Sequence, residues 1–362
     1  MTSRSFANGP LICVAGKQGR LGNRLSTCGH YVAVANNLNL PLISASINEY
    51  ADYFSGPSND LYCSYPDAST VFGNSKFQLF YELFMRVVEF YANKNKQHAS
   101  AARRFLEKHP RTFTSSISTI PTPEYRAMLL GAMYRIIEAA ENQNIKGAKV
   151  VVLRSKTAKA NKSLSITEQI KLNFDADILI FASFNFRDPE TYYSTKEPVR
   201  RFFSLVPDYE SKINSVIDLC RSSSEILVGI HARRDDYKNF QGGRYYYEQS
   251  HYAQIMEHIK SLYPNKKMGF LICSDEVLDP KYFANFNVQF GAGGVIEDLY
   301  ALSKCDFIVG PPSTFSGWAA YFGEKPRFIL TSDRAYPQRE DLEYYTPAGT
   351  TRELFGCDSI QS

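Results

Sequence analysis

The sequence has no apolar run long enough to cross a membrane, which takes roughly 18 residues. The short apolar stretch at residues 10–15 ends at Lys17 and Arg20, so we expect no secretory signal peptide. The seven cysteines form no CxxC pair and no Cys/His cluster, and several lie inside apolar runs, as free buried thiols do. A reducing compartment follows. We therefore expect a cytoplasmic protein, with association to a membrane surface left open.

Several catalytic signatures are also missing. There is no Gly-x-Ser-x-Gly elbow of a hydrolase, and the six histidines are scattered, which argues against a zinc site or a Ser/His triad. The Asp-x-Asp at Asp175 and Asp177 precedes a predicted strand, whereas a metal–diphosphate site would follow one. The pair Asp235 and Asp236 is a weaker candidate. We expect neither a metal nor another cofactor.

The charge balance gives little support for nucleic acid as a partner. The formal net charge is only +4, and the 24 tyrosines and 25 phenylalanines do not alternate with a basic stripe. Such an aromatic surplus suits sugar or base stacking, but core packing uses the same residues and is the expected explanation for most of them. A local cationic pocket for a phosphorylated ligand remains compatible with this balance.

With 362 residues, 44% hydrophobic and 22% charged, the chain is globular and long enough for two domains. Strand patterns alternate with helical patterns, which predicts an α/β fold with doubly wound, parallel sheets. Residues 187–220, broken by three prolines, are interpreted as a bridge between domains. Strands are predicted at residues 10–15, 41–44, 150–153, 178–181, 225–230, 268–273, 288–290, 306–309 and 326–330. Helices are predicted at residues 24–38, 77–91, 124–141, 252–262, 296–305 and 315–322.

The strongest local feature is residues 231–237, His-Ala-Arg-Arg-Asp-Asp-Tyr, where a buried strand stops at a charged loop. Ligands of open α/β sheets bind at the carboxyl ends of strands. One arginine of such a pair can bind a phosphate bidentately while the other braces the loop through a carboxylate such as Asp236. A surface cluster with an Arg–Asp salt bridge would have the same spacing.

Two further loops have the composition of anion sites. Ser313, Thr314 and Ser316 precede or begin a predicted helix, whose free N–H groups suit an anion, although plain N-capping explains the same residues. Residues 19–24, Gly-Arg-Leu-Gly-Asn-Arg, follow the first strand but lack the third glycine of a dinucleotide fingerprint and the ending of a P-loop. An ordinary strand-to-helix turn accounts for them equally simply.

In this order, the three segments resemble fucosyltransferases of the His-x-Arg-Arg-x-Asp class, especially bacterial α1,2-fucosyltransferases. The resemblance covers residues 15–30 and 225–325 and includes Tyr245 to Tyr247, Ser274–Asp275, and Glu297 through Trp318. Residues 19–23 also resemble the Gly-x-x-Gly-Asn loop of protein O-fucosyltransferases. The chain departs from the pattern at Asp235, Pro312 and Gly317. Residues 45–185 match nothing in these families.

The resemblance implies a GT-B fold, with two facing Rossmann-like domains and a helical N-terminal insertion. We expect an acceptor-side domain at residues 1–215, a nucleotide-sugar-binding domain at 216–345 and a tail at 346–362. It further implies that fucose is transferred from GDP-fucose to a glycan acceptor with inversion at the anomeric carbon. The 2-hydroxyl of galactose is a candidate acceptor position. A non-catalytic protein that binds a GDP-sugar or a glycan, or a transferase using another GDP-sugar, remains the alternative.

The same resemblance assigns roles to individual residues. Arg233 would hold the β-phosphate and stabilise departing GDP, and Arg234 would brace the loop. The nucleotide would contact His231, Asp298 and the phosphate-binding Ser313, Thr314 and Ser316. From the other domain the glycine loop, with Gly19, Arg20, Gly22 and Asn23, would approach the fucose and pyrophosphate. The general base stays open among Asp236, Asp235, Glu248 and His251.

Overall fold

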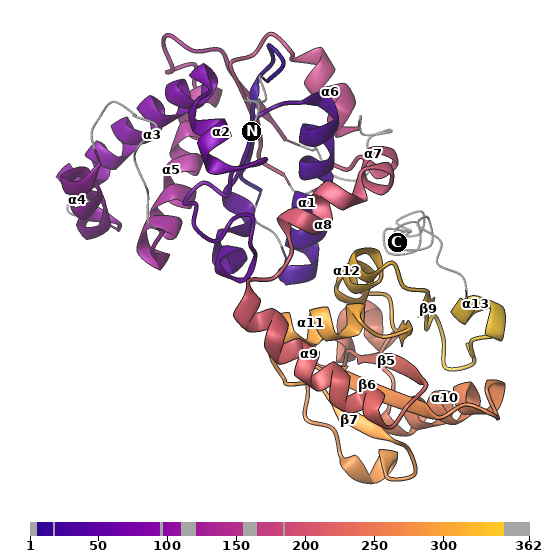
Figure 1. Ribbon diagram of the computed structural model, residues 1–362. Helices are drawn as coiled ribbons and strands as arrows, with labels where there is room; N and C mark the ends of the chain where they lie inside the picture. Colours follow the sequence, from indigo (N-terminus) through magenta and orange to yellow (C-terminus); the bar gives the residue numbers. More distant parts are fainter. Residues whose placement is uncertain are drawn as a thin grey trace. The chain divides into compact units, whose positions relative to one another are not determined.

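The structure, a computed structural model, describes residues 6–16, 19–94, 97–109, 121–154, 165–183 and 185–343. It divides into two compact units, Met1–Val206 and Pro207–Ser362 (Figure 1). The expected boundary at residues 215/216 falls inside helix α9 (Pro207–Ser222), which packs against β5, β6 and α11 of the second unit. The expected tail at residues 346–362 lies outside the described residues.

The first unit is built on four parallel strands in the order β2-β1-β4-β3. These are β1 (Leu11–Val14), β2 (Leu42–Ser44), β3 (Val150–Leu153) and β4 (Ile178–Phe181). Between β1 and β2 lies α1 (Leu21–Leu38). Because the chain runs from β1 to β2 on one side and returns through β3 on the other, the strand order reverses between β1 and β4.

Helices cover both faces of this sheet (Figure 1). On one face α1 contacts α6 (Ile166–Leu172), α7 (Pro189–Ser194) and α8 (Lys196–Phe202). On the other lie α3 (Ser75–Asn93), α4 (Ala99–Lys108) and α5 (Pro123–Glu141). The connection from β2 to β3 also holds the 3-10 helix η1 (Ala45–Tyr53) and α2 (Ala68–Phe72). This connection is the helical insertion expected in the N-terminal half.

Part of the aromatic surplus packs into this insertion. The ring of Tyr62 is met edge-on by Phe72, Phe77, Phe80 and Phe84, at centroid distances of 5.1 to 6.1 Å. Edge-to-face pairs of this kind stabilise a core beyond their burial of apolar area. Core packing therefore accounts for the phenylalanines of α3, as expected.

The second unit holds five parallel strands in the order β7-β6-β5-β8-β9. The strand order reverses between β5 and β8. The strands are β5 (Ile226–Ala232), β6 (Met268–Ser274), β7 (Val288–Phe290), β8 (Phe307–Gly310) and β9 (Arg327–Ile329). The helices are α9, α10 (Gln249–Leu262), α11 (Val295–Ser303), α12 (Thr314–Gly323) and α13 (Arg339–Glu343), with 3-10 turns η2 (Asp236–Lys238), η3 (Phe240–Gly243) and η4 (Pro280–Phe283).

Alternate residues of β5 face the two helical layers. Val228 and Ile230 share a buried cluster with Ile255 and Ile259 of α10. On the opposite face, Gly229 lies against Leu302 of α11 so closely that a β-carbon would meet the leucine at 2.8 Å. The absence of a side chain at Gly229 therefore lets α11 pack directly on the central strand.

Residues 187–220, interpreted as a bridge between domains, contain the boundary between the two units at Val206/Pro207. This stretch is helical and forms α7, α8 and α9; its prolines at 189 and 207 stand at the first helical position, where a missing N–H costs nothing. His231 and Ala232 belong to β5 itself, since their register continues opposite Cys273 and Ser274 of β6.

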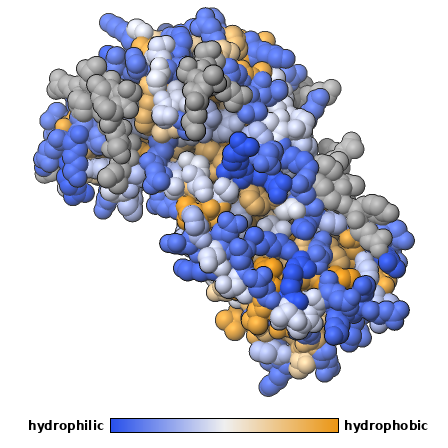
Figure 2. All heavy atoms as spheres, viewed as in Figure 1, coloured by the Kyte–Doolittle hydropathy of each residue, from blue (hydrophilic) through white to orange (hydrophobic). Residues whose placement is uncertain are grey.

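The surface and the thiols agree with a globular protein. Hydrophilic residues cover most of the face in Figure 2, with apolar patches between them. Within the described ranges, no helix combines the length and the apolar character needed to span a membrane. Every described cysteine is free and buried, at positions 13, 28, 63, 220, 273 and 305.

Candidate functional site

The loops after β5 and β8 meet where the strand order of the second sheet reverses. Such a reversal leaves a crevice at the carboxyl ends of the strands, because the connections on its two sides lead to opposite faces. Arg233 follows β5 and Ser313 follows β8, and the guanidinium Nη1 donates to Ser313 Oγ at 3.4 Å. Gly310, at the end of β8, approaches the His231 backbone too closely for a side chain. The two loops therefore form one site.

Arg233 is held in a fixed orientation by its own loop. Its Nε and Nη2 donate to the two carboxylate oxygens of Asp236 at 2.9 and 2.7 Å, and its guanidinium lies 4.8 Å from the centroid of the Tyr237 ring. Burial is the largest single effect and lowers the pKa of Arg233, but the hydrogen bonds to Asp236 and the nearby charges of Tyr237, Asp236 and Asp275 together raise the pKa above its usual value. The side chain remains 17% exposed, so a charged guanidinium is held in a fixed orientation at the crevice, with its Nε–Nη2 edge on Asp236.

Arg234 points into the protein instead. Its residue is 5% exposed, and its guanidinium donates to Glu276 at 3.1 Å, to the Tyr247 carbonyl and to the Tyr246 hydroxyl. Its backbone N–H donates to Asp275 Oδ1 at 2.8 Å. The adjacent arginines therefore have different surroundings: Arg234 ties the loop to β6 and to residues 246–247, while Arg233 faces the crevice.

His231 lies at the base of the site. Its ring stacks on Phe315 with centroids 5.0 Å apart, and it is 6% exposed. Burial, followed by the charges of Arg233 and Arg327, lowers the pKa of His231 to about 3, so the ring is neutral near pH 7. Among the described residues, Nδ1 has no hydrogen-bond partner. A buried, unsatisfied ring nitrogen beside a fixed arginine can accept a hydrogen bond from a bound ligand or donate one to it, depending on the tautomer.

The N-terminus of α12 completes this side of the site. Ser313 is the N-cap, and its hydroxyl accepts from Phe315 N at 3.2 Å, so the capping interpretation is confirmed. Thr314 is half-buried and begins the helix. Ser316 is fully buried and its hydroxyl donates to Ser313 O at 3.4 Å, which turns it into the helix interior.

Asp298 lies in the first turn of α11 and contacts the loop after β7. Its Oδ1 accepts from Gly293 N at 3.3 Å, and the carboxylate lies against Gly291. Burial raises its pKa to about 6, with a smaller contribution from Glu297. In the structure Asp298 therefore shapes a glycine loop at the end of β7, two strands from β5.

In the first unit, the glycine loop follows β1 at the point where that sheet reverses its order. Gly19 has φ +73°, and a β-carbon there would overlap the Asn23 side chain. Asn23 and Gly22 lie in the first turn of α1, for which Arg20 is the N-cap residue without a capping side-chain hydrogen bond. Arg24 Nε donates to Gly19 O at 3.1 Å. This loop exposes Arg20 beside uncapped helical N–H groups.

The candidate bases have different environments. Asp236 is bound bidentately by Arg233, and Asp235 is exposed on the same loop. Glu248 is 70% exposed and lies 3.6 Å from Arg234 Nη2. His251 is stacked on Tyr247 with centroids 5.1 Å apart, and burial lowers its pKa. Asp235 and Glu248 are thus the two carboxylates of this group that solvent reaches freely.

Both Asp-x-Asp carboxylates are bound to lysines. Asp175 pairs with Lys149, and Asp177 pairs with Lys76 and accepts from Lys149 N. Across the described residues, no group of three His, Cys, Asp or Glu side chains has the arrangement of a metal site.

Sequence reasoning gave no role to Asp275, Glu276 or Tyr246. Asp275 holds the backbone at Arg234 and Asp235, while Glu276 pairs with Arg234 and Lys238. The signal was present, because Asp275 and Glu276 follow β6, whose carboxyl end must lie beside that of β5 in a parallel sheet. The stacking of Tyr246 on Arg234, 4.5 Å away, had no such signal.

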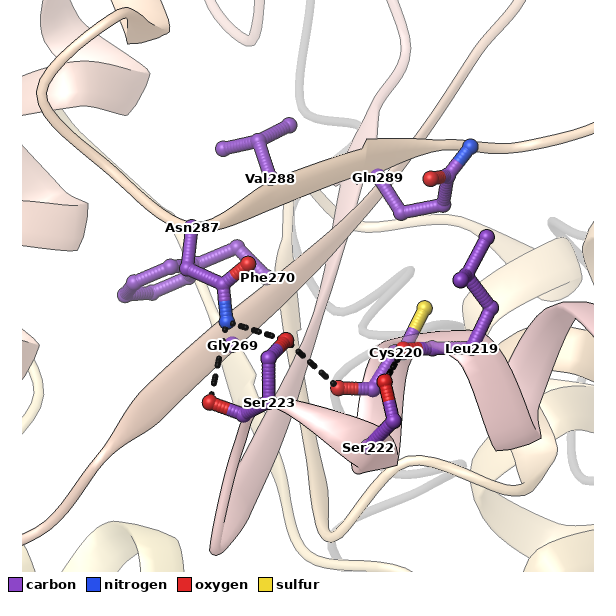
Figure 3. Close-up of a pocket in the computed structure, with 9 residues that line it drawn as sticks. All are labelled: Leu219, Cys220, Ser222, Ser223, Gly269, Phe270, Asn287, Val288 and Gln289. Carbon is purple, nitrogen blue, oxygen red and sulfur yellow. Dashed lines mark hydrogen bonds between the residues drawn. The ribbon is translucent and has the colours of Figure 1, made fainter.

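A small pocket of about 180 Å³ in the second unit lies elsewhere (Figure 3). Gly269 at the start of β6 and Asn287 just before β7 line it, so it is at the amino end of the sheet. Asn287 Nδ2 donates to Ser223 Oγ at 3.0 Å across it (Figure 3). This pocket is smaller than the ~300 Å³ at which ligand pockets usually begin, and it is remote from Arg233.

No family model and no curated protein matches the chain. Solved structures of similar fold do exist. A mutant of FUT1 from Arabidopsis thaliana in complex with GDP has a TM-score of 0.51 and 12% identity, over 91% of this chain and 72% of that chain. Fucosyltransferase NodZ from Bradyrhizobium has a TM-score of 0.45 and 12% identity, over 90% of this chain and 97% of that chain. POFUT1 in complex with GDP-fucose has a TM-score of 0.44 and 10% identity, over 92% of this chain and 99% of that chain. The likeness to FUT1 shows a shared fold, so the α/β, GT-B prediction with two Rossmann-like units is confirmed.

Proposed function

We propose that this protein is a glycosyltransferase that moves L-fucose from GDP-fucose to a sugar hydroxyl. The observation that carries the proposal is Arg233, an oriented guanidinium at the switch point of a Rossmann-like sheet, 3.4 Å from the N-cap of α12. The fold shared with FUT1, whose solved structure contains GDP, supports the same assignment. A guanidinium beside helix N–H groups stabilises a bound diphosphate.

The reaction divides charge in a way that these residues suit. The acceptor oxygen forms a bond to the anomeric carbon as the bond from that carbon to the β-phosphate oxygen breaks, and the electron pair leaves with GDP. Attack from the face opposite GDP inverts the anomeric configuration. The acceptor proton passes to a carboxylate or to water. Arg233 and α12 stabilise the negative charge on GDP without moving during the step.

The remaining site residues are proposed to have supporting roles. His231 would hydrogen-bond the nucleotide through Nδ1, and Arg234 would hold the loop that orients Arg233. Thr314 would contribute at the α12 N-terminus, whereas Ser316 and Ser313 act through the helix cap. Asp298 is proposed to place the loop after β7 against the base or ribose. Arg20 and Asn23 would act on the fucose and pyrophosphate, and galactose O2 is the proposed acceptor position.

The experiment is a titration of the full chain with GDP and UDP by calorimetry, followed by incubation with GDP-fucose. We expect GDP to bind more tightly than UDP and GDP-fucose to be hydrolysed slowly without acceptor. Transfer is then measured with galactoside acceptors whose 2-hydroxyl is either free or blocked. A chain that neither binds GDP nor consumes GDP-fucose would refute the proposal.

A second candidate is a non-catalytic protein that binds a GDP-sugar. The specific observation in its favour is that Asp236 occupies two of the three nitrogens of the Arg233 guanidinium. GDP binding without hydrolysis or transfer of any GDP-sugar would support this candidate. Competition between GDP-fucose and GDP-mannose separates either candidate from a transferase for another donor.

A further inference from the structure

The first unit contains a cavity of about 540 Å³ between η1 and α5. Its volume lies in the range of ~300–1,000 Å³ that is usual for small-molecule sites. Every residue that lines it belongs to the helical insertion or to the start of α1. None of these residues belongs to the donor site proposed above. Arg24 links the cavity to the glycine loop through its hydrogen bond to Gly19 O.

Two helical faces form its walls. From α5 come residues at helical spacing, Ala127, Leu130 and Tyr134, which make one wall largely apolar and end it with an aromatic ring that is 48% exposed. From η1 come Asn48, Glu49 and Asp52, which make the facing wall polar. A ligand here meets an apolar face on one side and hydrogen-bonding groups on the other.

The charges of the polar wall are compensated. Glu49 pairs with Arg24 at 2.7 Å, and Asp52 pairs with Arg126. The two arginines are buried, with side chains 9% and 6% exposed, whereas the two carboxylates are 51% and 65% exposed. The carboxylates therefore remain accessible as hydrogen-bond acceptors, and the four formal charges of the two pairs sum to zero. Such a wall favours hydroxyl donors on a neutral ligand over an anion or a cation.

Arg126 makes the wall rigid. Its guanidinium also donates to Ser58 O at 3.1 Å and Asp60 O at 3.3 Å, and its carbonyl accepts from Asn48 Nδ2 at 3.4 Å. Its Nε is buried without a partner among the described residues. A polar wall fixed in this way is pre-organised and orders few groups on binding.

We infer that this cavity binds the acceptor and that the acceptor is a neutral saccharide. A sugar ring has an apolar C–H face, suited to the α5 wall and Tyr134, and a rim of hydroxyl donors, suited to Glu49 and Asp52. Arg24 lines the cavity and donates to Gly19 O, which joins the cavity to the glycine loop. An extended peptide is commonly recognised by addition to a sheet edge, and no residue that lines this cavity belongs to a strand.

The inference rests on the proposed function, and its test separates the two. Ala127 is exposed and lines the cavity, so Ala127→Trp fills it without entering the core. Glu138→Trp adds the same ring to an exposed position of the same helix that does not line the cavity. Binding of lactose, N-acetyllactosamine, diacetylchitobiose, sialyllactose and a threonine-containing peptide is followed by saturation-transfer NMR. GDP-fucose hydrolysis and transfer are measured in parallel.

We expect at least one neutral oligosaccharide to bind the wild type and Glu138→Trp, and to lose binding and transfer in Ala127→Trp, with hydrolysis unchanged. Unchanged saccharide binding in Ala127→Trp, or binding of only sialyllactose or the peptide, would overturn the inference and leave the transferase proposal intact. Saccharide binding that Ala127→Trp abolishes, in a protein that ignores GDP, would support the cavity and refute the transferase.

A second variant guards against misfolding of Ala127→Trp. Tyr134→Ala removes a ring that is 48% exposed, and Tyr282→Ala in the second unit removes one that is 49% exposed. We expect the KM for the saccharide to rise in Tyr134→Ala, with hydrolysis unchanged, and Tyr282→Ala to match the wild type. Equal KM values in the two variants would count against the apolar wall as the sugar platform.

Discussion

In the second unit, the site is built from loops that follow strand ends, whereas the cavity of the first unit combines a segment that follows β2 with helix α5 of the insertion. Both sheets are parallel and reverse their strand order, at β5/β8 and at β1/β4. Arg233 and Ser313 lie within three positions of the ends of β5 and β8. The residues that line the cavity come from η1, α5 and α1 among other segments and extend from residue 24 to residue 134. The comparison teaches that similar sheets can be equipped in different ways, by strand-end loops or by an insertion.

Two bidentate Arg–Asp pairs, at opposite ends of the second sheet, test whether the carboxyl end of that sheet is the functional end. Arg233 binds Asp236 after β5, while Arg221 binds Asp306, just before β8, at 2.9 and 3.0 Å. Lysine keeps the charge but loses the fork. We expect Arg233→Lys to lower GDP-fucose turnover by about 10²- to 10³-fold, since it removes an oriented donor to the leaving group.

Arg221→Lys is the matched control and should retain turnover. Steady-state kinetics on both variants, with melting temperatures to confirm folding, decide the matter. If the two variants lose turnover equally, the effect comes from the stability of the unit, and the carboxyl end of the sheet has no special role.

The neighbouring arginine tests whether the two arginines of one motif have separate roles. Arg234→Met leaves Glu276 and the Tyr247 carbonyl without their buried cation, and we expect a loss of about 4 kcal/mol in the free energy of unfolding. Lys238→Met removes the exposed partner of the same Glu276 and should leave stability nearly unchanged. Urea denaturation measures both. Similar small losses would mean that Arg234 is not a structural centre of the loop.

Much of the fold was predictable because its strands are short apolar runs between turn residues. All nine predicted strands exist, and the pattern at residues 231–237 identified the loop at the switch point. The direction of Arg234 was not predictable from the local sequence, because it depends on Asp275 and Glu276, which are 40 or more positions away. Arg233, in contrast, is held by Asp236 of its own loop. The burial of Ser316 was not predicted either, because it depends on which face of α12 packs against the protein interior.

The cavity of the first unit escaped prediction for a physical reason. Glu49 and Asp52 look like surface residues of a polar segment, and only their buried partners Arg24 and Arg126 reveal a wall. Buried arginines have no sequence signature, since arginine is mostly exposed in proteins. Helix α5 was predicted, but the face of α5 that borders the cavity is determined by η1. The sequence of η1 did not predict a helix.

Asp298 gives a comparison of pH dependence within α11. Burial raises its pKa to about 6, above the value of ~3.9 in an unfolded chain. Between these values the folded state holds a proton that the unfolded state has lost, so stability falls as the pH rises from about 4 to about 6. Asp298→Asn should remove this fall, about 2–3 kcal/mol, and be the more stable protein at pH 7.

Glu297→Gln, one position away, is the control and should keep most of the slope. The free energy of unfolding is measured without nucleotide at pH 4, 5, 6 and 7. Parallel curves for Asp298→Asn and the wild type would show that the carboxyl is not buried against the glycine loop as described.

The smallest expected effect concerns two glycines of the first unit that share a backbone conformation. Gly19 and Gly147 have φ +73° and +83°, so an alanine at either costs about 1 kcal/mol of stability. A β-carbon at Gly147 meets nothing within 4 Å, whereas at Gly19 it would displace Asn23. We therefore expect both variants to lose similar stability, and only Gly19→Ala to lower transfer as well. Melting curves and fucose-transfer rates are compared for the two variants. An equal fall in transfer would mean that the strain of the backbone accounts for the effect, whereas unchanged transfer in both would count against a role of Asn23 in the reaction.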